Sequence, residues 1–171
     1  MTDIRQISDW DAETEKRVSH AVELFREGYN CSQAVSLAFA DLYGIPEPLM
    51  ARLSASFGGG IGRMRETCGA ACGMFLLAGL EEPSAEGDEN PYPQAEAKKK
   101  NYEAVQRLAE QFRSTTGSLL CRELLGLEKS APTPPTPEAR TPQYYAKRPC
   151  SFMVETGVRT FMSFLRERYQ G

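Results

Sequence analysis

A stretch rich in glycine and cysteine, residues 57–73, constrains the fold more than any other part of the chain. It contains six glycines and two of the five cysteines, Cys68 and Cys72. Glycine lets the backbone adopt left-handed conformations and approach another group closely, at a cost in conformational entropy. We therefore expect residues 58–62 to form a loop that wraps a functional site. The alternative is an ordinary turn between two helices.

The segment after this loop predicts a buried helix over residues 68–80, because it is an almost continuous apolar run. Thr67 is a favourable N-cap residue, so Cys68 is expected in the first helical turn. The free backbone amides of a first turn stabilise a thiolate or a metal-bound sulfur. Consecutive glycines of the loop are expected to aim their own amides at the same sulfur site. These glycines are Gly58, Gly59 and Gly60.

The rest of the chain also predicts helices. Apolar residues recur at spacings of three and four, and no stretch alternates with the period of two typical of a strand. Residues 81–93 have the composition of a surface loop, and residues 130–142, with five of the eleven prolines, that of an extended or flexible crossing. The sequence predicts a single all-α domain over residues 1–171, with six or seven helices packed around the helix at 68–80. The other helices are expected at residues 11–27, 31–43, 46–57, 94–114, 119–125 and 149–169.

The composition excludes several classes of function. With 20 basic and 23 acidic residues the net charge is −3, which gives no electrostatic basis for binding nucleic acid or an anionic membrane. No apolar run is long enough to cross a bilayer, and the polar N-terminus lacks the apolar core of a signal peptide. We therefore expect a cytoplasmic protein without membrane insertion, whose thiols are kept reduced. The single histidine, His20, rules out a metal site with two histidine ligands.

Four of the five cysteines fall at or near predicted helix starts. Any one of them alone is most simply a small buried hydrophobic residue. Helix N-termini, however, lower the pKa of a thiol and favour the thiolate that takes part in redox or ligand chemistry. Basic neighbours in the sequence add nothing, because 20 of 171 residues are lysine or arginine and such neighbours are expected by chance. The four are Cys31 after Asn30, Cys68 after Thr67, Cys121 in the turn after Ser118, and Cys150 after Pro149.

Cys68 and Cys72 are four positions apart, which puts them on one face of a helix with Cβ atoms about 5–6 Å apart. A disulfide needs Cβ atoms about 3.5–4.5 Å apart, so this pair cannot form one inside a regular helix. The close CxxC spacing of zinc ribbons is absent, so sequence spacing gives only weak support for a metal site.

Several segments of the chain resemble one protein family. They are residues 28–34 (GYNCSQA), 57–60 (FGGG) and 68–73 (CGAACG), followed by Cys121 and Cys150. On these motifs, residues 21–150 resemble the C-GCAxxG-C-C family of proteins described as redox-active. The resemblance implies four shared cysteines and makes Cys72 an addition at a variable position. The four are Cys31, Cys68, Cys121 and Cys150.

The resemblance also bears on cofactors. Split-Soret cytochromes have a similar cysteine-bearing region, for which an iron–sulfur centre has been proposed. A covalently attached haem is excluded, because the chain lacks a CxxCH motif. Four cysteines are common ligands of both zinc and iron–sulfur clusters, and Cys72 is a candidate for a further ligand.

Three functions remain open on the sequence alone. The preferred one is redox chemistry through the four shared cysteines, either thiol–disulfide exchange or electron transfer, with Cys31 and Cys68 as the most exposed thiols. The second is an iron–sulfur cluster or a zinc ion bound by the same cysteines, and the third is a non-catalytic helical binding module with scattered, buried thiols. For the first two we expect the four cysteines to converge on one site. The expected partner is a redox protein or a small-molecule electron carrier.

Overall fold

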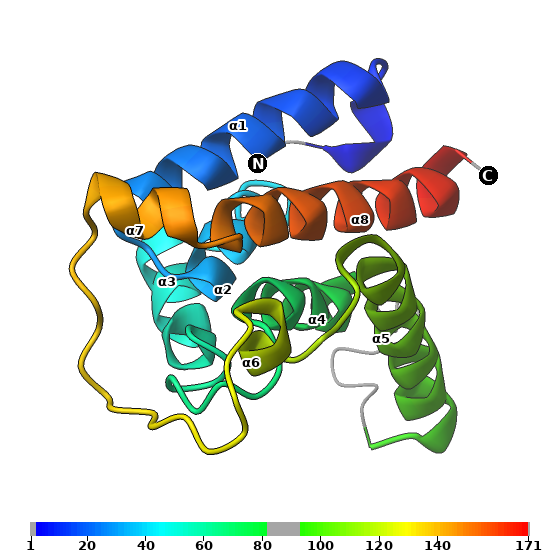
Figure 1. Cartoon of the computed structure of the whole chain (residues 1–171). Coiled ribbons are helices and arrows are strands. Elements are labelled where there is room, and N and C mark those ends of the chain that lie inside the picture. The colour runs from blue at the N-terminus through cyan, green and yellow to red at the C-terminus, as the bar shows by residue number, and fades with distance from the viewer. Residues whose placement is uncertain (1–2, 82–92, 171) are drawn as a thin grey trace.

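The computed structural model of the chain (Figure 1) describes residues 3–81 and 93–170. Within these residues there are eight α-helices, six of them with seven or more residues, two short 3-10 helices and no strand, which confirms the all-α prediction. The predicted loop over 81–93 lies almost wholly outside the described residues. The helices are η1 (Ile4–Gln6), α1 (Trp10–Arg26), α2 (Cys31–Leu37), α3 (Glu47–Ser54), η2 (Ala55–Phe57), α4 (Gly69–Glu81), α5 (Ala95–Thr116), α6 (Cys121–Leu124), α7 (Pro142–Lys147) and α8 (Cys150–Gln170).

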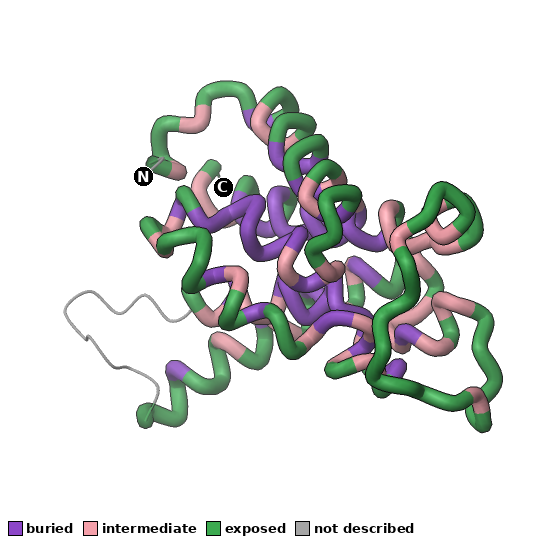
Figure 2. The backbone as a smooth tube through the Cα atoms, turned by 90° about the vertical axis from the view of Figure 1, so that its left-hand side faces the viewer, coloured by how far each residue is buried: buried purple, intermediate pink, exposed green. Residues whose placement is uncertain are grey.

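The cysteine-bearing helix α4 lies at the centre of the fold, as predicted. It packs against α2, α5 and α8, while α1 lies along α8 (Figure 1). Nine of its thirteen residues are buried, because the helix is apolar on nearly every side. Figure 2 shows that the buried backbone gathers where these helices meet and that the outer segments are exposed. A buried central helix of this kind fixes the position of whatever its N-terminus carries.

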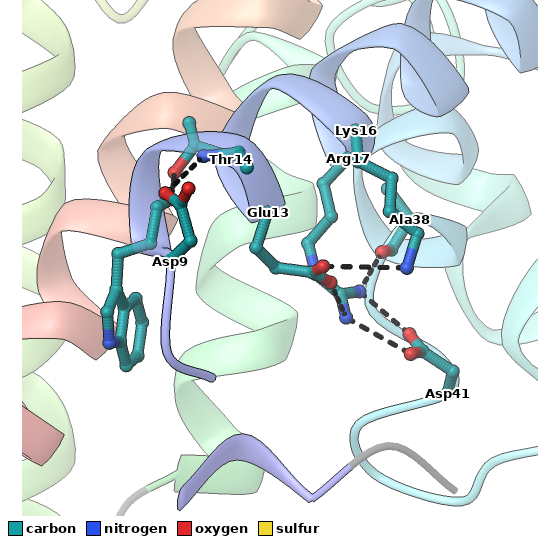
Figure 3. A network of polar contacts seen from close by, with 9 residues as sticks. Asp9, Glu13, Thr14, Lys16, Arg17, Ala38 and Asp41 are labelled. Atoms are coloured by element: carbon teal, nitrogen blue, oxygen red, sulfur yellow. Dashed lines mark hydrogen bonds and ion pairs between the residues drawn. The ribbon is translucent and has the colours of Figure 1, made fainter. Parts of the chain in front are cut away.

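A buried arginine joins α1 to the turn that follows α2 (Figure 3). The Arg17 guanidinium donates to both carboxylate oxygens of Asp41, at 2.7 and 3.0 Å, and forms an ion pair with Glu13 at 2.7 Å. It also donates to the backbone carbonyl of Ala38. A buried charge is stable only with such partners, so this network holds the two segments in one arrangement.

The same contact accounts for an error in the predicted boundaries. The helix expected over residues 31–43 ends at Leu37. Beyond it, the amides of Phe39, Ala40 and Leu42 donate to carbonyls three residues back, as in turns and 3-10 structure. Arg17 donates a hydrogen bond to the carbonyl of Ala38. In a continuing α-helix this carbonyl would accept a hydrogen bond from the amide of residue 42.

Residues 130–141, called the strap below, run without helix or strand from the α6 side of the molecule to α7. Figure 1 shows this segment as the long yellow-to-orange connection. Helix α7, which starts at Pro142, was not predicted from the sequence. Thr141 is its N-cap, and the Thr141 hydroxyl accepts a hydrogen bond from the Tyr144 amide at 3.1 Å. In the described part of the chain, no helix is long and apolar enough to cross a membrane.

Candidate thiol site

The four predicted cysteines lie at the starts of four different helices. Cys31, Cys121 and Cys150 are the first residues of α2, α6 and α8. Cys68 directly precedes α4, which begins at Gly69 and not at Cys68 as predicted. In the first of these, Asn30 caps the helix as expected: its side chain accepts from the Gln33 amide, and the Gln33 side chain accepts from the Asn30 amide, both at 3.0 Å.

All four cysteines line one cavity of about 470 Å³. They come from positions spread over most of the chain, so the fold itself brings them together. Cavities of this size hold small-molecule ligands in other proteins. The same cavity is lined by the three loop glycines named above, Gly58, Gly59 and Gly60.

Two of these cysteines, Cys31 and Cys150, interact as a pair, and each shifts the pKa of the other. Both are partly exposed, whereas Cys68 and Cys121 are buried, so the expectation that Cys68 is among the most exposed thiols is wrong. The hydrogen bond to Cys150, together with burial, raises the pKa of Cys31 well above its ordinary value. The hydrogen bond from Cys31 lowers the pKa of Cys150 to about 7, against the effect of burial and with help from Arg148, Arg140 and Arg65. When the pair loses one proton, it is therefore Cys150 that becomes the thiolate, while Cys31 stays protonated.

Cys68 occupies the cap position of α4. The backbone amides of Ala70 and Ala71, in the first turn of the helix, donate to its sulfur. These hydrogen bonds favour the thiolate, but burial has the larger effect and raises the pKa of Cys68 to about 12. Cys68 also lies beside Cys31, because a Cβ atom on Gly69 would come within 3.2 Å of the Cys31 Cβ. Gly69 thus allows the starts of α2 and α4 to pack closely.

A short β-bridge holds Cys121 near Cys68. Thr67 and Leu120 form the antiparallel bridge, and the amides of the two cysteines make hydrogen bonds on either side of it. The Cys68 amide donates to the carbonyl of residue 119 at 2.7 Å, and the Cys121 amide donates to that of residue 66 at 2.6 Å. The Arg65 guanidinium lies 3.8 Å from the Cys121 sulfur. Burial raises the pKa of Cys121, and Arg65 opposes this effect.

The loop between η2 and α4 has an unusual backbone. All five residues 59–63 have positive φ, and so has Arg65; these include the side-chain-bearing residues Ile61 (φ 59°) and Arg63 (φ 63°). Left-handed conformations cost about 1–2 kcal/mol per residue that carries a Cβ, and a β-branched residue such as Ile61 rarely adopts them. Strain of this kind persists where the surrounding structure enforces it, often at functional sites.

The loop packs directly against the cavity. A Cβ atom on Gly60 would lie 2.5 Å from the Cys121 Cβ, and one on Gly58 would lie 2.4 Å from the side chain of Asn30, the cap of α2. The amides of Ile61 and Gly62 donate to backbone carbonyls of residues 57 and 56, and so do not reach sulfur. The amides found on the Cys68 sulfur belong to α4.

A sequence model of the family described as "Putative redox-active protein (C_GCAxxG_C_C)" matches residues 29–164. The chain belongs to this family. The C_GCAxxG_C_C match includes all four cavity-lining cysteines. In this member the central motif reads Cys68-Gly69-Ala70, with the first two letters in the reverse of the order in the family's name. No curated protein and no solved structure matches the chain.

Cys72 stands apart from the C_GCAxxG_C_C cysteines. It is buried and is not among the residues that line the cavity; its thiol donates to the Thr67 carbonyl at 3.8 Å. Burial raises the pKa of Cys72 to about 11. Among residues 3–81 and 93–170, no group of three or more Cys, His, Asp or Glu side chains is arranged so that it could hold a metal ion. The described side chains therefore form no preformed site for a single metal ion.

The arginines around the C_GCAxxG_C_C thiols were not predicted from the sequence. Basic residues are so frequent in the sequence that a basic neighbour of a cysteine does not indicate a site. In the structure, however, Arg63, Arg65 and Arg148 line the cavity. Arg140 lines it as well, from the strap, where it lies ten positions from the nearest cysteine. Arg140 reaches the cavity only because the strap runs past it. No local sequence pattern predicts the path of the strap.

Proposed function

We propose that the protein is a dithiol–disulfide oxidoreductase in which Cys31 and Cys150 form the redox pair. The observation that carries the proposal is that both thiols lie in the wall of one cavity, where each shifts the pKa of the other. Thiols that interact this directly need only a small movement to form a disulfide. Both side chains are partly exposed, so a substrate can reach them.

Cys150 is the attacking thiol in this proposal, because it is the thiolate of the pair. It attacks one sulfur of a substrate disulfide, which forms a mixed disulfide and releases the other substrate sulfur as a thiolate. The Cys31 sulfur then attacks Cys150, releases the second substrate thiolate, and gives up its proton to one of the two. The substrate disulfide gains two electrons, and the pair loses two as the Cys31–Cys150 bond forms.

Cys68 and Cys121 have a different role in this proposal. Burial keeps both protonated at neutral pH, so neither is suited to the first attack. They line the same cavity and lie near the redox pair. We assign them to later exchange with the Cys31–Cys150 disulfide.

The two other functions predict different arrangements. A zinc ion needs three or four ligands around one point, and the described side chains form no such group. A binding module with scattered thiols does not require four cysteines to line one cavity. The shared cavity supports the redox function over a binding module, and the interacting thiol pair supports it over a zinc site.

One set of measurements on purified protein tests the proposal. The protein is purified without oxygen, and its visible spectrum and its iron, zinc and sulfide contents are recorded. It is then oxidised mildly, free thiols are counted, and cross-linked peptides are identified by mass spectrometry. We expect colourless protein that reversibly loses two thiols first, with residue 31 joined to residue 150.

Two variants and a control sharpen the result. Cys31→Ser should stop the exchange at the mixed disulfide, and Cys150→Ser should abolish the first step. Cys72→Ser should behave like the unchanged protein, because Cys72 does not line the cavity. Stoichiometric iron and sulfide, or thiols that never couple under oxidation, would contradict the proposal.

A further inference from the structure

We infer that the cavity selects small disulfides that carry carboxylate groups, which it binds through the arginines on its wall. This inference rests on the proposed function and adds the chemical class of the substrate. It depends on the charge of the wall, on the arginine side chains that line it, and on the size of the cavity.

The wall of the cavity is positive in a protein that is negative overall. Four arginines line it against one glutamate, Glu138, so the charged side chains sum to +3. The whole chain carries −3. Even with a thiolate at Cys150, the wall stays positive. A positive cavity with apolar surroundings concentrates anions and repels cations.

Two arginine nitrogen atoms on this wall are buried without a hydrogen-bond partner among the described residues. They are Nε of Arg63 and Nη1 of Arg140. Carboxylates are strong acceptors for guanidinium groups. The guanidinium groups of Arg63 and Arg140 belong to residues that line the cavity, and they are the donors that we assign to the substrate.

The position of each arginine is fixed by neighbouring residues. Arg140 stacks over the rings of Phe25 and Tyr144, at 4.7 and 4.8 Å from the ring centroids. Arg63 forms an ion pair with Glu138 at 3.7 Å and donates to the carbonyl of Thr136. Side chains held in this way lose little conformational entropy when a ligand binds.

The size of the cavity sets the size of the substrate. A volume of about 470 Å³ holds a small molecule and excludes a folded protein. The redox pair lies in the same wall as the arginines, so one ligand can place its disulfide at Cys150 and a carboxylate at Arg140.

The experiment compares three disulfides of similar length and different charge. They are 3,3′-dithiodipropionate, a dianion, bis(2-hydroxyethyl) disulfide, which is neutral, and cystamine, a dication. The rate at which each oxidises the reduced protein is divided by its rate with N-acetylcysteamine, a thiol with no other charged group, to remove the intrinsic reactivity of the disulfide. We expect the dianion to have a corrected rate at least about tenfold above that of the dication, the factor that one charged hydrogen bond provides.

Variants locate the effect. Arg140→Gln should reduce the ratio of the dianion rate to the neutral rate by about three- to tenfold. The neutral disulfide reacts at Cys150 as well, so dividing by its rate cancels any change in the reactivity of Cys150 itself. Arg113→Gln is the control, because Arg113 is paired with Glu110 on α5 and does not line the cavity. It should leave all ratios unchanged.

A sulfur-free ligand separates the two proposals. Suberate is a dicarboxylate of the same length, and its binding to the reduced protein is measured by calorimetry. We expect it to bind and Arg140→Gln to weaken the binding. If all three disulfides react at equal corrected rates and suberate does not bind, the inference is wrong and the proposed function stands. If suberate binds and no disulfide oxidises the pair, the proposed function is wrong and the anion site stands.

Discussion

Cys31 and Cys150 are the same residue type at the same kind of position, the first residue of a helix, and yet their pKa values move in opposite directions. The difference comes from the proton between them and from the arginines on the Cys150 side. A thiolate at Cys150 accepts the Cys31 proton and lies near Arg148, Arg140 and Arg65. Placing the charge on Cys31 instead would forgo most of this stabilisation.

The reactivity of Cys150 should therefore increase with pH around a midpoint of about 7. Its pKa is lowered, so the thiolate is present above that pH and is lost as pH falls below it, whereas an ordinary cysteine is still mostly protonated at pH 7. The measurement is the rate of iodoacetamide alkylation at Cys150 against pH. Cys31→Ala removes the hydrogen-bond donor and should raise the midpoint by about 1–2 pH units. Cys31→Ser keeps a donor and should raise it less; equal midpoints in both variants would refute the role of the hydrogen bond.

Gly60 should be the most sensitive glycine of the loop. Gly60→Ala adds a Cβ atom 2.5 Å from the Cys121 Cβ, at a φ of +72°. We expect a loss of about 2–5 kcal/mol in the free energy of unfolding, from backbone strain and overpacking together. Gly62 is the matched control, with a φ of +58° and no atom within 4 Å of an added Cβ. Gly62→Ala should cost only about 1–2 kcal/mol, the strain alone, and urea denaturation of both variants would measure the difference. Equal costs would show that contact with Cys121 contributes nothing.

At the level of elements, the helix starts were predictable because capping is local chemistry. Asn30 and Gln33 form the expected capping box, and α8 begins at Cys150 after Pro149, as predicted. Contacts between distant segments were not predictable. Cys68 became a cap because residues 66–68 pair with residues 119–121, and α2 ends early because Arg17 takes a carbonyl at its end.

The strap is the element whose stability should depend on oxidation state. Glu138 forms ion pairs with Arg63 and Arg148, while Arg140 stacks on Tyr144. Arg140 and Arg148 both stabilise the Cys150 thiolate, and oxidation removes that charge. We expect trypsin to cleave after Arg140 about two- to fivefold faster in the oxidised protein, since exposed ion pairs are worth up to about 1 kcal/mol.

Glu138→Gln provides the comparison for the strap. In the reduced protein this variant loosens the ion pairs with Arg63 and Arg148 without changing the thiols, and should give a similar increase in cleavage. Equal cleavage of the oxidised and reduced unchanged protein would argue against the coupling.

For the whole molecule, the fold class and the central helix were predictable from periodicity and apolar content. The family, and with it the four cysteines, was identified from motifs. The pairing of Cys31 with Cys150 was not, because it depends on how α2 and α8 pack on α4, and no residue near either cysteine encodes that packing. The same holds for Arg140, which reaches the cavity only through the path of the strap.

The positions of the redox pair in the chain have a consequence for the protein's lifetime. A bond between residues 31 and 150 would close a covalent ring of about 120 residues, and a ring of that size stabilises a folded chain by about 5 kcal/mol through the lost entropy of the unfolded chain. Oxidised protein should therefore need more urea to unfold than reduced protein, and Cys150→Ser should remove the difference. Since proteases in a cell act mainly on unfolded chains, each electron pair given to a substrate would also slow the turnover of the molecule that gave it.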